Sequence, residues 1–230
     1  NWIAANAEEK NIVRAISLGD ITEKDTEAEY NIVEDAFKAL DGVVPHTIVR
    51  GNHDVANFDK YITYEEYKDT VDGSYNQSMR NTYNLFEQGG RKYMLLNLDC
   101  GAKDPDLEWA NEVVAAHPDY NVIVATHLYM YRNGRTIDSW YGVEDYGQNS
   151  GTTIWNDFVS LHENIVMVLC GHIDYDGIIR NVCLCRGKGV SEVLSRCREE
   201  NYVCIFQSFL RSICYLYIFV QRNSRKKVYV

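Results

Sequence analysis

Helical and extended hydrophobic patterns alternate along residues 1–180 of the sequence. Residues 2–10 have the pattern of the end of a helix, and the apolar run at 12–18 predicts a strand that closes at Gly19-Asp20. Residues 26–40 carry apolar positions at helical spacing and predict an amphipathic helix.

The same alternation continues toward residue 180. Extended patterns predict further strands at 46–49, 92–98, 121–125 and 165–169. Helical patterns predict further helices at 105–116 and 153–161. Several of these strands are apolar throughout, which is typical of strands buried on both faces in layered α/β folds. The sequence therefore predicts an α/β protein.

Two long stretches, roughly 55–90 and 129–150, lack either pattern and are rich in Tyr, Asn and Asp. We expect them to be irregular, and loops of this length in a compact domain are usually functional. Residues 203–220 are strongly apolar but are interrupted by Gln207 and Arg211. They predict two strands and no membrane span, for which about 20 mostly uncharged residues are needed.

Charge divides the chain into two regions. The 230 residues have a formal net charge of −10, and this acidic balance argues against generic nucleic-acid binding, which relies on basic patches. Residues 181–230 carry nine basic and three acidic side chains, a net charge of +6, which leaves −16 for residues 1–180. We therefore expect an α/β core over 1–180 and an atypical basic, Cys-rich segment over 181–230, which completes or flanks a second sheet.

The cysteines and the first residues leave the compartment open. Five of the seven cysteines lie beyond residue 180, in spacings that match no zinc-ribbon or finger pattern. Cys100 and Cys170 each end an apolar run, which favours buried free thiols. The chain opens with Asn1-Trp2 and shows no secretory signal, so a secreted, a periplasmic and a cytoplasmic parent protein all stay open.

Polar clusters follow four of the predicted strands, namely Gly19-Asp20, Gly51-Asn52-His53-Asp54, Thr126-His127 and Gly171-His172. The carboxyl ends of neighbouring strands in an α/β sheet meet at one edge, where ligands bind. Carboxylate, amide oxygen and imidazole suit divalent ions such as Zn, Mn or Fe. Each residue also has a structural alternative, because Asp20 could cap a turn and a single histidine at a strand end is often structural. The ordered conjunction of four clusters favours a metal site.

These motifs, written LGDITEK, RGNHD, THLY and CGHID, resemble in order and separation the successive motifs of the calcineurin-like metallophosphoesterase superfamily, most closely its bacterial members. The resemblance covers about residues 1–180 and implies a four-layer αββα sandwich. It also implies a centre of two divalent ions, Mn, Fe, Zn or Mg, whose identity the sequence does not decide.

The resemblance assigns roles residue by residue. Asp20 would bridge two ions, and Asn52, His127 and His172 would complete the second metal site. His53 would assist the leaving group, with Asp54 holding its ring. The implied reaction is phosphate-ester hydrolysis by a metal-bound hydroxide, with two ions about 3.5–4 Å apart stabilising the attacking and leaving oxygens.

The sequence departs from the superfamily pattern at two points. The superfamily opens with a strand whose Asp ligates the first metal, and we expect the chain to begin after that strand, truncated at its N-terminus. The last motif is usually Gly-His-x-His, whereas here the second histidine is replaced by Asp174. Asp174 could ligate a hard cation or could be a loop residue, and both interpretations stay open.

The loop between the last two clusters contains candidate substrate contacts, namely Tyr129, Arg132 and Arg135. Arginine forks match phosphate oxygens, and aromatic faces can stack on a base or sugar. The alternative is that these aromatics pack the loop onto the core.

The sequence thus predicts a metal-dependent hydrolase of small phosphomonoesters or phosphodiesters, with no nucleic-acid partner and no membrane span. Two hypotheses compete with it. One is a metal-binding fragment or pseudoenzyme with impaired catalysis. The other is a nucleic-acid-binding tail on such a domain, although the tail lacks repeated basic spacing. Substrate and oligomeric state are not decided by the sequence.

Overall fold

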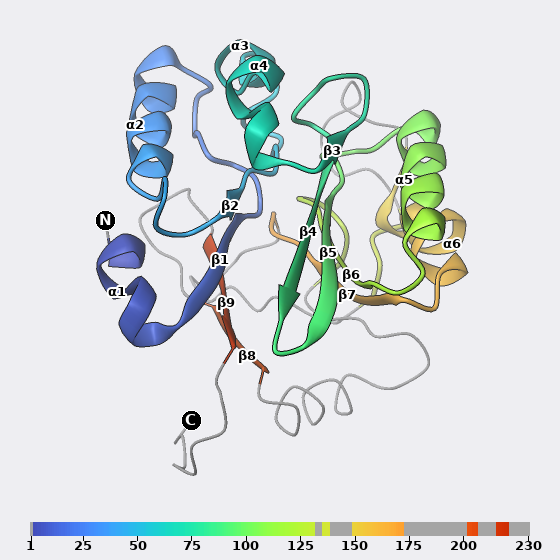
Figure 1. The fold of residues 1–230 in the computed structure, drawn as a ribbon. Coiled ribbons are helices and arrows are strands. Elements are labelled where there is room, and N and C mark those ends of the chain that lie inside the picture. Colours follow the sequence, from blue (N-terminus) through green and yellow to red (C-terminus); the bar gives the residue numbers. More distant parts are fainter. Residues whose placement is uncertain (1, 132–134, 139–148, 173–201, 207–214, 221–230) are drawn as a thin grey trace.

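The protein is arranged in four layers, with two sheets stacked face to face and helices on both outer sides (Figure 1). This computed structural model describes residues 2–131, 135–138, 149–172, 202–206 and 215–220. The αββα arrangement implied by the sequence is confirmed.

Most helices and strands lie where the hydrophobic pattern predicts them, with the exception of residues 55–90. The helices are α1 (Trp2–Lys10), α2 (Glu27–Lys38), α3 (Phe58–Tyr61), α4 (Tyr64–Tyr67), α5 (Asp104–Ala116) and α6 (Gly151–Asp157), with short 3-10 turns at Lys68–Thr70 and Val159–Leu161. The strands are β1 (Ile12–Ser17), β2 (His46–Thr47), β3 (Gly73–Ser74), β4 (Thr82–Gln88), β5 (Arg91–Asn97), β6 (Asn121–Ala125), β7 (Ile165–Leu169), β8 (Tyr202–Phe206) and β9 (Tyr215–Val220).

Sheet order places the strands that precede the polar clusters next to one another. One sheet has the order β2-β1-β9-β8, in which β1 is parallel to β2 and antiparallel to β9. The other has the order β3-β4-β5-β6-β7, in which β5, β6 and β7 are parallel. The two strands expected within 203–220 are present as β8 and β9, and both belong to the sheet of β1. The domain boundary at residue 180 stays a prediction, because residues 173–201 lie outside the described residues.

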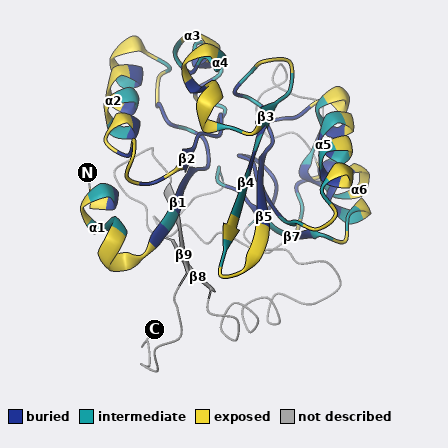
Figure 2. Cartoon of the chain, in the orientation of Figure 1, coloured by how far each residue is buried: buried dark blue, intermediate teal, exposed yellow. Residues whose placement is uncertain are grey.

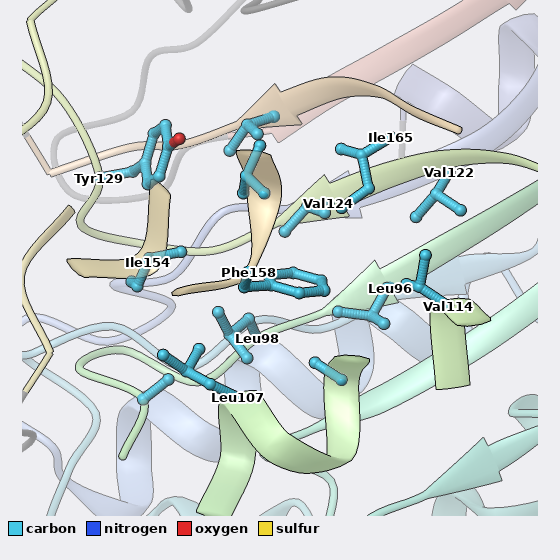
Figure 3. Close-up of a cluster of buried hydrophobic side chains, with 14 of the residues drawn as sticks. Leu96, Leu98, Leu107, Val114, Val122, Val124, Tyr129, Ile154, Phe158 and Ile165 are labelled. Carbon is cyan, nitrogen blue, oxygen red and sulfur yellow. The ribbon is translucent and has the colours of Figure 1, made fainter. Parts of the chain in front are cut away.

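Alternation of side chains along the strands divides the interior into layers. On β5, Met94 and Leu96 face the layer of α5 and α6, whereas Tyr93 and Leu95 face the opposite sheet. Residues two apart on a strand point to the same face, so an all-apolar strand serves two cores at once. Figure 2 shows the result, with buried strands between helices whose outer faces are exposed. Figure 3 shows the cluster between the second sheet and its helices, where Phe158 lies among Leu98, Leu96 and Val124.

The expectation of an irregular stretch over 55–90 is wrong. It contains α3, α4, β3 and the seven-residue strand β4, which pairs antiparallel with β5 from Thr82↔Asn97 to Gln88↔Arg91. The strand was missed because polar residues such as Thr82 and Asn84 interrupt its apolar pattern. Thr82 and Asn84 are buried, and Asn84 donates a hydrogen bond to the carbonyl of Thr70 at 2.6 Å.

The two cysteines that end apolar runs are free and buried, as predicted for Cys100 and Cys170. Burial raises the pKa of the Cys170 thiol to about 12. At neutral pH this thiol is therefore protonated and behaves as a small apolar group.

We expect Leu96→Ala to lower the free energy of unfolding by about 2–5 kcal/mol, because the substitution opens a cavity in a closed cluster. Leu96 is fully buried, whereas Leu161 is 59% exposed. Leu161→Ala serves as the matched control and should change the free energy by less than about 0.5 kcal/mol. Urea unfolding followed by circular dichroism measures both, and equal effects would contradict this account of the core.

Candidate metal centre

Four side chains from four strand ends meet at one edge of the two sheets. Asp20 follows β1, Asn52 follows β2, His127 follows β6 and His172 follows β7. Asp20 and His172 have left-handed backbones, with φ of +52° and +66°. Such a conformation costs a residue with a side chain about 1–2 kcal/mol. It persists only where the surroundings hold it, and it is concentrated at functional sites.

The distances between the ligand atoms of these residues are short. His127 Nε2 lies 2.9 Å from Asn52 Oδ1, 3.1 Å from His172 Nδ1 and 3.3 Å from Asp20 Oδ2. His172 Nδ1 lies 2.7 Å from Asn52 Oδ1. The sequence prediction that Asp20, Asn52, His127 and His172 come together therefore agrees with the geometry.

The hydrogen bond on the other ring nitrogen of His127 sets the chemistry of this cluster. Nδ1 lies 2.7 Å from the carbonyl oxygen of Leu18, which only accepts, so Nδ1 carries the proton. In the neutral ring Nε2 then presents its lone pair to the cluster. Asn52 Oδ1 and the ionised carboxylate of Asp20 are also acceptors. Lone pairs that face one another at about 3 Å are the arrangement that a divalent cation stabilises.

The charges of the cluster depend on one another. Burial acts to raise the pKa of Asp20, but the charge and hydrogen bond of His127, together with the backbone N–H of His53, lower it below its usual range. Burial acts to lower the pKa of His127, and the carboxylate of Asp20 raises it. Burial and the charge of His127 lower the pKa of His172 to about 4. At neutral pH a carboxylate and a neutral His172 imidazole therefore face the centre.

The chain approaches the cluster closely because two glycines precede its ligands. A Cβ on Gly19 would lie 2.5 Å from His127 Nδ1, and a Cβ on Gly51 would lie 2.1 Å from the backbone nitrogen of Asp20. Neither space admits a side chain, so glycine is needed at both positions. These residues fit a divalent ion, with oxygen and nitrogen donors in a cradle that a side chain would fill. Within the described part of the chain, Asp20, His127 and His172 form one group of potential metal-ligating side chains.

His53 lies beside this cluster but is held differently from the expectation. Its ring is exposed, and Nδ1 lies 2.8 Å from the carbonyl oxygen of Glu23. That hydrogen bond raises the pKa of His53 above its usual value. Asp54 does not hold the ring, which corrects the role expected for it. The carbonyl of Glu23 takes that place, and no side-chain pattern in the sequence indicates a backbone acceptor.

Asp54 instead fastens the two loops that carry Asp20 and Asn52. Its side chain is fully buried. Oδ1 accepts hydrogen bonds from the backbone and hydroxyl of Thr22 at 2.8 and 2.9 Å, and Oδ2 accepts from the backbones of Gly51 and Ile21 at 2.8 and 3.1 Å. Burial raises the pKa of Asp54 despite these donors. Asp54 is thus a positioning residue.

A buried ion pair next to the centre was not predicted from the sequence. The guanidinium of Arg50 meets the carboxylate of Asp99 through two parallel hydrogen bonds of 2.7 and 2.5 Å, and the two side chains are 3% and 7% exposed. Arg50 precedes Gly51, and Asp99 follows β5 in the other sheet. The position of Asp99, just after an apolar strand, is the signal that could have drawn attention to it.

The expected substrate contacts do not gather here. Tyr129 is 1% exposed and packs in the cluster of the second sheet, as the packing alternative expects. Its assignment as a substrate contact has no support from this position. Arg135 is exposed. Arg132 and Asp174 lie outside the described residues, so their roles stay predictions.

The fold is a layered α/β sandwich, and at its strand ends it carries a group of side chains that could hold a metal ion. The family model described as calcineurin-like phosphoesterase matches residues 1–175, and the chain belongs to this family. It is 29% identical over 182 residues to the uncharacterized protein YvnB of Bacillus subtilis (strain 168). That alignment covers 74% of this chain and 13% of YvnB, so the chain spans a small part of that relative. No solved structure matches significantly. Among the described residues, no helix has the length and apolarity that a membrane crossing requires.

We expect Asp54→Asn to lower the free energy of unfolding by at least about 2 kcal/mol, because an amide group would turn its own N–H bonds toward buried donors. Loss of the loop fastening should also lower the affinity of the protein for Mn²⁺. Calorimetric unfolding and Mn²⁺ titration measure the two effects. Asp119, exposed in the turn before β6, provides the control variant Asp119→Asn, which should change neither quantity. A stable Asp54→Asn protein with full metal affinity would refute the fastening role.

Proposed function

We propose that this domain hydrolyses phosphate esters, as a phosphomonoesterase or phosphodiesterase. Divalent metal would be held by Asp20, Asn52, His127 and His172. The observation that carries this proposal is that His127 Nε2 lies 2.9, 3.1 and 3.3 Å from Asn52 Oδ1, His172 Nδ1 and Asp20 Oδ2, respectively. The membership of the chain in the calcineurin-like phosphoesterase family supports the reaction class. A centre of two ions is part of the proposal, and Asp20 would be one of the residues that hold them.

A bound divalent ion supplies positive charge that polarises a phosphoryl oxygen and lowers the pKa of a coordinated water. The residues of the chain do the rest. Asp20 and the two histidines fix the position of the charge, and the hydrogen bond from His127 to Leu18 fixes the orientation of one ligand ring. In the balanced reaction, the oxygen of water bonds to phosphorus and the bond between phosphorus and the alcohol oxygen breaks. One proton must then reach the departing alkoxide.

His53 is the group that we assign to this proton transfer. Its Nδ1 is bound to the Glu23 carbonyl, and Nε2 is the ring nitrogen left to exchange a proton. Because the carbonyl favours the protonated ring, the acid form of His53 is more populated at neutral pH than that of a free histidine. A positioned acid of this kind is worth about 100- to 10,000-fold in rate.

Metal content and turnover, measured together, test the assignment of the ligands. We expect His172→Ala to reduce bound Mn²⁺ after dialysis and to lower the hydrolysis of p-nitrophenyl phosphate and of its bis ester at least about 100-fold, since a lost ligand displaces the ion. His117 is half-buried, bonds the Val113 carbonyl at 2.7 Å and lies away from the cluster. His117→Ala is therefore the matched control and should retain metal and turnover.

Unchanged metal content in His172→Ala would reject the site. Bound metal without turnover of either ester in the unsubstituted protein would favour the hypothesis of a metal-binding pseudoenzyme.

The choice of leaving group tests His53. We expect His53→Asn to lower kcat about 100-fold or more for an alkyl phosphate, whose alkoxide needs a proton, and much less for p-nitrophenyl phosphate, whose phenolate leaves without one. Metal content should stay constant. An equal loss on both substrates would mean that His53 does not act as the acid.

A further inference from the structure

A second concave site lies at the same edge of the sheets as the metal centre. It is a cavity of about 620 Å³, and its wall comes from the segments around α3 and α4, the loop before β4 and the segment after β5. Figure 1 shows α3, α4 and β3 together at that edge. Two lining residues, Arg50 and Val55, directly bracket the segment Gly51–Asp54, which carries Asn52 and His53. The volume is in the range of pockets that bind small molecules.

Most of the charged side chains that line the cavity already have partners. Arg50 is paired with Asp99. Arg80 meets Asp59 through two hydrogen bonds, one of them 3.0 Å between Nε and Oδ1. Because these pairs neutralise one another, the wall offers little net charge to attract a second phosphate. The exception within the described residues is Lys103, which is exposed.

Two neutral polar side chains of the wall differ from these charged ones. Asn76 and Gln77 are exposed at the rim of the cavity, and their side-chain amides have no protein partner among the described residues, so each presents two donors and one acceptor. Tyr64 and Tyr75, both half-buried, add aromatic faces. The ring of Tyr75 is held by Trp109, with 5.8 Å between centroids. Amides and fixed aromatic rings match the hydroxyl groups and the C–H faces of a polyhydroxylated molecule.

The turn that contains Asn76 and Gln77 has a strained backbone. Ser78 donates its backbone N–H to the carbonyl of Tyr75 at 3.2 Å, and Asn76 and Gln77 between them have φ of +53° and +52°. This is a type I′ turn, which Asn-Gly would form with less strain. Gln77 keeps a long polar side chain where glycine is the unstrained choice. Strain of this kind is concentrated at ligand-binding sites.

We propose that this cavity binds a neutral, polyhydroxylated group, a glycosyl or polyol unit, and that this group is the alcohol half of the ester hydrolysed at the metal centre. The second part of the statement rests on the proposed function. Hydrolysis then releases the free polyol, which has taken up the proton, and inorganic phosphate or a phosphomonoester.

Binding can be tested without metal and without turnover. Chelator-treated protein is titrated with maltose, cellobiose, sucrose and glycerol, each followed by saturation-transfer-difference NMR. We expect saturable binding of at least one of them, weakened at least fivefold by Asn76→Gly and by Gln77→Gly. Both substitutions preserve the left-handed turn, so they remove the amides without disturbing the fold.

Asn11 supplies the matched control. It is an exposed asparagine with φ of +52° between α1 and β1, and it does not line the cavity. Asn11→Gly makes the same chemical change in the same backbone conformation and should leave binding unchanged. The proposal is overturned if none of the four compounds binds saturably, or if the turn variants bind as the control does. It is also overturned if inorganic phosphate occupies the cavity in preference to them and is lost with Lys103→Ala.

The link to the reaction needs a separate measurement. We expect kcat/KM for glucose 1-phosphate to exceed that for phenyl phosphate, and the ratio to fall at least fivefold in Asn76→Gly. An unchanged ratio would separate the cavity from the substrate. If saccharide binds but no ester is turned over, the proposed function fails while the cavity assignment stands.

Discussion

The candidate metal centre depends on the hydrogen bonds that the carboxylate of Asp54 accepts. Each of its oxygens accepts two hydrogen bonds, and the donors belong to two loops that are about 30 residues apart in sequence. Without this acceptor, three backbone N–H groups at a buried position would have no partner. The carboxylate therefore sets the separation of the loops, and through it the distance between Asp20 and Asn52. Asp20 adds one hydrogen bond to this fastening, because its Oδ1 accepts from the backbone N–H of His53 at 3.0 Å.

Asp25 extends the same fastening away from the ions. It accepts hydrogen bonds from the backbones of Ala56 and Asn57 and from the hydroxyl of Tyr30. The same hydroxyl lies 3.1 Å from the carbonyl oxygen of Asp54, so its single proton faces both acceptors. On the other side, the Arg50–Asp99 pair joins the first sheet to the second at the base of the same loop. Buried ion pairs add little net stability, and their contribution here is one of geometry.

The elements that the sequence predicts well are those whose side chains face apolar surroundings on both sides. β6 and β7 are found at the predicted residues, because an uninterrupted apolar run of this length is typical of a strand buried on both faces. The convergence of Asp20, Asn52, His127 and His172 was also predictable, because each follows a strand and the ends of neighbouring strands meet at one edge. β4 was missed because it is stabilised by its hydrogen bonds to β5, and the pattern of its own residues does not indicate that pairing. Asp54 was placed beside the ring of His53 because sequence order says nothing about which donors a carboxylate faces. The Arg50–Asp99 pair joins residues 49 apart, and only the packing of the sheets brings them together.

The position of β9 has a consequence for how the domain forms. β9 lies against β1, so that Tyr217 is opposite Ala15 and Tyr215 is opposite Ser17, the residue before Leu18 and Gly19. During synthesis, β1 is made long before β9, its partner on this edge. Until then its free edge is a template on which other extended chains can add. Contacts of such long sequence separation also make folding slow. Because β2 covers the other edge of β1, the edge that β9 later covers is the one that stays open during synthesis.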